Sequence, residues 1–201
     1  MATQNGAIEQ LIQAFGRLPG VGAKTAERLA HHILKCPPDE ALALADAIRG
    51  VKERVRHCEK CFNLTDHEQP LCALCRDSKR DQGVVCVVEQ PRDLMAIESA
   101  GTYNGVYHVL LGRLAPLQGS GPEQLTIQPL MERVRSGEVR EVIMATNPNL
   151  EGDGTSLYLA NCLAETGVTI TRLARGLASG SVLEFANKAM LADALTGRQR
   201  F

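Results

Sequence analysis

Four cysteines constrain the fold of this chain more than any other feature. Cys58 and Cys61 form one C-x2-C pair, Cys72 and Cys75 form a second, and ten residues separate the pairs. Each pair offers two ligands from one tight turn, and four thiolates can surround one tetrahedral Zn²⁺. Because such a site leaves no position open for water, we expect one structural zinc per chain that braces the fold.

The same spacing also fits other chemistry. A C-x2-C turn suits a redox dithiol or half of an iron–sulfur site, and four cysteines can form two disulfides or a chance cluster. His57 and His67 are alternative zinc ligands, but four cysteines favour an all-thiolate set. Seven cysteines, an odd number, follow a start without a basic and apolar signal segment, which indicates the reducing cytoplasm. No apolar run reaches the ~18 residues of a membrane span.

The front of the chain predicts two helices joined by a glycine hairpin. Apolar residues recur at helical spacing over 8–15 and 26–34, and Leu-Pro-Gly-Val-Gly at 18–22 interrupts them. Gly20 and Gly22 permit a sharp reversal and leave backbone N–H groups uncovered where the second helix begins. Those groups and the helix dipole suit a DNA phosphate, and Lys24 and Arg28 lie one turn apart beside them.

This stretch resembles the helix-hairpin-helix motif of proteins that bind DNA without sequence preference. By the resemblance, Gly20, Gly22, Lys24 and Arg28 are candidate DNA-binding residues. The alternative is an ordinary helical hairpin with solvated cations. A net charge of −1 argues against a polycation that coats nucleic acid, so any DNA contact must be local. A third helix is expected over 39–56.

The rear of the chain alternates apolar strands with helices. The expected strands cover 84–88, 106–111, 141–145 and 169–173, and the expected helices cover 91–99, 127–134 and 155–166. Such alternation predicts an open parallel sheet with right-handed crossovers. Ligands of these sheets bind at the carboxyl ends of the strands.

Three acids fall at two of those strand ends. Glu89 follows the first strand, and Glu151 and Asp153 follow the third. Two acids two residues apart in an extended segment point the same way and can share one Mg²⁺ with a third. The arrangement resembles the Toprim domain of topoisomerases, primases and related nucleases, whose usual pair is Asp-x-Asp. A Mg²⁺ site, a partner contact and solvated loop acids are all open interpretations.

The order of the three parts resembles one family, the bacterial recombination mediator protein RecR. The resemblance covers almost the whole chain. Besides the four cysteines, it is carried by residues 18–29, 87–89, 111–123, 145–155 and 173–181.

The resemblance implies an α/β multidomain fold. The expected domains are a helix-hairpin-helix domain over 1–56, a four-cysteine zinc-finger module over 57–79, a Toprim domain with a parallel sheet over 80–175, and a short helical C-terminal segment over 176–201.

The family also implies a non-enzymatic scaffold. Its members form dimers and ring-shaped tetramers that encircle single- or double-stranded DNA and work with RecO and RecF to load RecA at single-stranded gaps. Lys24 and Arg28 would then face DNA, and Glu89, Glu151 and Asp153 would serve partner contact or structural hydrogen bonding rather than cleavage. One alternative is a Mg²⁺-dependent Toprim nuclease or topoisomerase-like enzyme. Another is a zinc-braced interaction module that never touches DNA.

Overall fold

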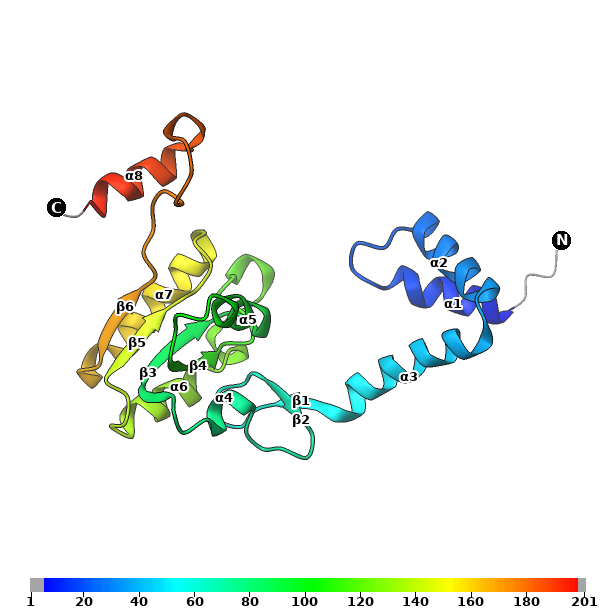
Figure 1. Ribbon diagram of the computed structural model, residues 1–201, viewed down its shortest axis with the longest axis horizontal. Helices are drawn as coiled ribbons and strands as arrows, with labels where there is room; N and C mark the ends of the chain where they lie inside the picture. The colour runs from blue at the N-terminus through cyan, green and yellow to red at the C-terminus, as the bar shows by residue number, and fades with distance from the viewer. Residues whose placement is uncertain (1–5, 199–201) are drawn as a thin grey trace. The chain divides into compact units, whose positions relative to one another are not determined.

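A computed structural model describes residues 6–198 of the 201-residue chain. The chain divides between Val55 and Arg56 into two compact units, and each unit is described by itself. The N-terminal unit is helical, and the C-terminal unit contains a sheet with helices packed on it (Figure 1). In the described part of the chain, no helix has both the length and the apolar character needed to cross a membrane.

The N-terminal unit contains the expected helix, hairpin and helix. Its helices are α1 (Gly6–Gly16), α2 (Ala23–Lys35) and α3 (Pro38–Arg54). Small Ala26 and Ala30 are buried on α2, which lets α1 and α2 approach closely. Pro38 occupies the first position of α3, where its missing N–H costs no hydrogen bond.

The cysteine segment begins the C-terminal unit and is more structured than a polar loop. Strands β1 (Val55–His57) and β2 (Leu64–Asp66) pair, and the short helix α4 (Ala73–Arg76) follows. The third helix, expected to reach residue 56, ends at Arg54 because Val55 adopts extended backbone (φ −104°, ψ 129°) and starts β1.

The main sheet is the predicted parallel one. Its strand order is β4–β3–β5–β6, and every neighbouring pair is parallel. The bounds are β3 (Asp81–Val88), β4 (Gly105–Val109), β5 (Glu141–Met144) and β6 (Thr169–Arg172). The α/β multidomain fold expected from the sequence is therefore confirmed.

Helices and turns fill the crossovers between these strands and follow the last of them. They are α5 (Pro91–Ser99), η1 (Pro116–Gln118), η2 (Pro122–Gln124), α6 (Ile127–Arg135), α7 (Leu150–Leu163), η3 (Ala164–Thr166), η4 (Leu183–Phe185) and α8 (Lys188–Thr196). Helix α8 supplies the expected C-terminal helical segment.

Side chains alternate between the two faces of the sheet, as strand geometry requires. Val85 and Val87 point into a core shared with α6 and α7. Cys86 and Val88 point to the other face, where α5 packs and where Phe62 and Leu74 of the cysteine segment also contact the core. The cysteine segment thus belongs to the hydrophobic structure of the sheet.

A charged network ties the cysteine segment to the first crossover. Arg80 donates two hydrogen bonds to Glu98, of 2.9 and 2.5 Å, and a third of 3.0 Å to the carbonyl of Gly105. The Tyr107 hydroxyl donates to the same Glu98 carboxylate at 2.6 Å. Burial of Glu98 opposes its ionisation, but these donors outweigh burial and hold the pKa of Glu98 below its usual range.

We expect Glu98→Gln to lower the free energy of unfolding by about 1–3 kcal/mol at pH 7.5, because Arg80 loses its charged acceptor. A group with a lowered native pKa stabilises above its unfolded pKa and stops doing so as pH falls through the native value. The deficit should therefore stay constant down to about pH 4.3 and shrink below it. Urea titrations at a series of pH values check this, with exposed Glu132→Gln as the control. A deficit independent of pH throughout would contradict it.

Candidate metal centre and nucleic-acid interface

The four cysteines converge on one point. Their sulfur atoms all lie within 4.8 Å of one another, and within residues 6–198 they form the only such group of three or more potential His, Cys, Asp or Glu ligands. Cys58, Cys61 and Cys72 are buried. Cys75 is partly exposed as a residue, but its ligand atom is enclosed with the others. The two histidines considered as ligands stay outside the cluster.

The donor set fits zinc. Tetrahedral zinc with bonds of about 2.3 Å places its sulfur ligands about 3.8 Å apart. Cys61 Sγ and Cys72 Sγ are 3.5 Å apart, and the backbone N–H of Cys72 donates to Cys58 Sγ at 3.3 Å. The hydrogen bond between Cys61 and Cys72 raises the pKa of Cys61 and lowers the pKa of Cys72. A divalent cation would replace the shared proton.

The glycine hairpin presents its cations as expected. Gly20 has φ +78°, a conformation that favours glycine, and Gly22 forms the N-cap of α2. Lys24 and Arg28 are both exposed and lie four residues apart, on one face of α2. No atom of the described chain lies within 4 Å of a Cβ built at either glycine.

The prediction of an extended acid pair was wrong. Helix α7 begins at Leu150, five residues earlier than expected, so Glu151 and Asp153 lie in its first turn. The Asn149 side chain accepts from Gly152 N at 2.8 Å and caps the helix, and acids in a first turn favour the helix dipole. Residues two apart on a helix project about 200° apart, so the pair does not point one way.

Each acid is engaged by a different partner. Buried Glu89 accepts two 2.8 Å hydrogen bonds, from the backbone N and the side-chain amide of Asn147. Glu151 forms an ion pair with Arg113, and Asp153 forms one with Arg175, which lowers the pKa of Asp153. Within residues 6–198, Glu89, Glu151 and Asp153 do not form a group that could hold a metal ion, so the structure gives no support to the Mg²⁺ interpretation that the sequence left open.

Sequence reasoning missed the partners of these acids. Arg113 and Arg175 lie 38 and 22 residues from their partners, in segments without helical or strand periodicity. The one available signal was that both arginines follow a strand, Arg113 after β4 and Arg175 after β6, at the edge of the sheet where the acids also lie.

Comparisons with known proteins match every part of the chain. The RecR helix-hairpin-helix model matches residues 8–52, the RecR four-cysteine zinc finger domain model matches 55–77, and the Toprim domain model matches 83–174. A protein of Rhodopirellula baltica named "Recombination protein RecR" is 59% identical over 200 residues, all of both chains. The chain belongs to the RecR family.

Further relatives carry the same name. The RecR protein of Paenarthrobacter aurescens is 50% identical and covers 96% of both chains. That of Chloroflexus aurantiacus is 52% identical over 96% of this chain and 93% of its own. The family expected from the sequence is confirmed, and the helix-hairpin-helix and zinc-finger assignments fall on the hairpin and the sulfur cluster described above.

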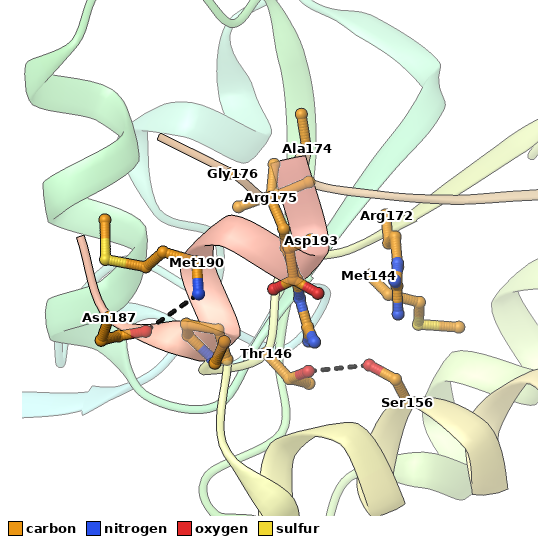
Figure 2. Close-up of a pocket in the computed structure, with 13 residues that line it drawn as sticks. Met144, Thr146, Ser156, Arg172, Ala174, Arg175, Gly176, Asn187, Met190 and Asp193 are labelled. Atoms are coloured by element: carbon orange, nitrogen blue, oxygen red, sulfur yellow. Dashed lines mark hydrogen bonds between the residues drawn. The ribbon is translucent and has the colours of Figure 1, made fainter. Parts of the chain in front are cut away.

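The carboxyl edge of the sheet in this RecR chain also holds a cavity of about 400 Å³. Figure 2 shows residues of α8 closing it over the end of β6. The Thr146 and Ser156 hydroxyls are hydrogen-bonded at 2.7 Å, and Asn187 caps α8 by accepting from Met190 N. These polar groups already satisfy one another, so they indicate no ligand.

Gly152 lets the acid-bearing turn close on the sheet. A Cβ at Gly152 would collide with the carbonyl oxygen of Asn147 and lie 2.9 Å from Glu89 Oε1. At Gly154, two residues later in α7, nothing in the described chain lies within 4 Å of a Cβ. Gly152 therefore permits a close approach between α7 and the segment before it, whereas Gly154 does not have this role.

We expect Gly152→Ala to destabilise the protein by about 1–3 kcal/mol, because the backbone must move to accept the methyl group. The matched control, Gly154→Ala, should stabilise it by about 0.5–1 kcal/mol, since alanine favours a helix interior. Equilibrium unfolding in urea measures both, and equal effects of the two substitutions would contradict the close approach at Gly152.

Proposed function

We propose that this chain is a DNA-binding recombination mediator in recombinational DNA repair. The observation that carries the proposal is the pair of exposed cations beside the glycine-capped start of α2, in a chain of the RecR family. The protein acts in the cytoplasm as a scaffold without catalytic turnover. It works with RecO and RecF to load RecA at single-stranded gaps.

DNA binds at the hairpin through its phosphates. Gly20 and Gly22 leave open space for a phosphate to approach the backbone, and the first N–H groups of α2 have no partner within the helix. Lys24 and Arg28 add two cations on the same face. These contacts read no bases, so single- and double-stranded DNA of any sequence are substrates for binding.

The protein assembles as a dimer or a tetrameric ring. Leu44, Ile48, Val51 and Val55 form a stripe at helical spacing along α3 and its end, and Ile48 and Val51 are 59% and 60% exposed. A second copy is the occupant that suits this stripe, because self-association on an apolar helix face buries the same side chains in both copies. A ring encloses DNA with few phosphate contacts, which accords with a net charge of −1.

We assign a separate role to each part of the chain. We assign residues 1–56 to DNA binding, 57–79 to a module braced by one structural zinc at Cys58, Cys61, Cys72 and Cys75, 80–175 to the Toprim domain, and 176–201 to the C-terminal segment. The zinc module holds the start of the sheet unit in shape.

The acids separate into two roles. Glu89 is 2% exposed with both oxygens bonded, so it serves structure. The side chains of Glu151 and Asp153 are 34% and 44% exposed, so they remain accessible to a basic surface of RecO or RecF. The competing Mg²⁺-dependent nuclease is disfavoured because Glu89, Glu151 and Asp153 each bond to a different partner and do not converge on one metal position.

Reversing the charge of Lys24 and Arg28 to Glu is expected to weaken binding to single- and double-stranded DNA. The plot of log affinity against log salt concentration has a negative slope, and its magnitude should decrease by about 2, since two phosphate contacts are lost. Fluorescence anisotropy over a salt series measures both quantities. Lys35→Glu is the matched control, because Lys35 is exposed at the other end of α2, about 16 Å along the helix from Lys24 and about 10 Å from Arg28.

Unchanged DNA affinity in the double variant would favour an interaction module that never touches DNA. In the same samples, DNA cleavage that requires Mg²⁺ and disappears in Glu151→Ala would overturn the scaffold and favour the nuclease.

Sedimentation at micromolar concentration should give a dimer or tetramer mass for the native protein. Ile48→Glu should shift the mass toward the monomer, because it places a charge within the apolar stripe. Glu53→Lys, about 140° around α3 from Ile48, should leave the mass unchanged. A strictly monomeric native protein would contradict the ring.

A further inference from the structure

Groups from three segments bond to the outer edge of the sheet next to the cysteine cluster, and one of them is the Thr126 hydroxyl, which donates to the carbonyl of Val109 at 2.7 Å. Strand β4 lies at one end of the sheet, and its Tyr107 and Val109 direct their backbone groups away from β3. The Val109 N–H donates to the carbonyl of Cys61 at 2.8 Å. The Arg133 guanidinium, from α6, donates to the carbonyl of Tyr107 at 2.8 Å. Since Tyr107 and Val109 are two residues apart, these two contacts lie within about 6.6 Å of each other along the strand.

Arg133 forms no ion pair with a carboxylate within residues 6–198. Arg80, Arg113, Arg140 and Arg175 each pair with a carboxylate. The Nη2 atom of Arg133 is buried and has no hydrogen-bond partner within residues 6–198. Arg80 Nε is also buried without a hydrogen-bond partner, but the guanidinium of Arg80 already bonds to Glu98. A buried guanidinium left with an unused donor is costly, so it indicates an anion nearby.

The anionic group to which these contacts point is the cysteine cluster, because Cys61, which bonds to the same stretch of β4 as Arg133, is one of its four members. The direction of the electrostatic effect agrees: burial lowers the pKa of Arg133, and Cys75, Cys61, Tyr103 and Cys58 oppose that change. His108, on β4, is the other titratable group next to Arg133 that could carry a positive charge here. Burial lowers the pKa of His108 to about 4, so it is neutral at physiological pH.

Four thiolates around Zn²⁺ carry a net charge of −2, and a site enclosed by protein must offset that charge with donors and cations. We infer that Arg133 is the counter-cation of the zinc tetrathiolate and clamps the cysteine segment to the edge of β4. Arg133 is a positioning residue that raises zinc affinity without ligating the metal. The inference rests on the proposed zinc occupancy of the cysteine cluster.

The test compares zinc retention in Arg133→Met, Arg133→Lys and native full-length protein. Methionine keeps the apolar stem and removes the charge, whereas lysine keeps the charge. We expect Arg133→Met to weaken zinc affinity and speed zinc release to a chromogenic chelator by about 10- to 100-fold. Arg133→Lys should keep most of the native affinity. Arg135→Met, an exposed arginine two residues later in α6, should release zinc at the native rate.

A second readout separates charge from packing. Co²⁺-substituted protein has a thiolate-to-metal charge-transfer band, and loss of a nearby cation should shift this band in Arg133→Met but not in Arg133→Lys. Native zinc retention in Arg133→Met, or equal loss in both Arg133 variants, overturns the inference. Native protein that binds no zinc overturns the zinc site itself, whereas native protein with one zinc and an unaffected Arg133→Met contradicts only the role of Arg133.

Discussion

The open edge of β4 is the constraint on which the C-terminal unit depends. An edge strand leaves backbone N–H and C=O groups without partners, and a buried edge must find them elsewhere. Here Cys61 accepts from Val109, and Arg133 donates to Tyr107. The metal-binding segment and a crossover helix therefore complete the sheet together. The geometry of the cysteine segment, the packing of Phe62 and Leu74, and the order of the sheet edge are consequently coupled.

The opposite end of the strands follows another rule. There the acids that resemble a Toprim metal site bond to arginines and to an amide, and not to a common site. Glu89 is held by Asn147, and the two acids of α7 are held by Arg113 and Arg175. Carboxylates arranged in this way connect the segments at the strand ends to the first turn of α7.

Local patterns predicted most of the fold because they involve residues close in sequence. The Val-rich strand over 84–88, the proline that ends α2 and the glycine hairpin each act within a few residues. The start of α7 was predicted five residues late because Pro148, Gly152 and Gly154 resemble a loop. The Asn149 cap and the close approach at Gly152 outweigh their low helix propensity.

The sequence by itself determined the four-cysteine cluster, the glycine hairpin with its cations, the parallel sheet and the family, because each depends on spacing along the chain. Tertiary structure alone decided which charges meet. The pairs Arg113–Glu151 and Arg175–Asp153 and the placement of Arg133 at the edge of β4 join residues far apart in sequence. No local periodicity encodes such contacts, because they arise only when strands and crossovers pack and bury groups that must then find a partner.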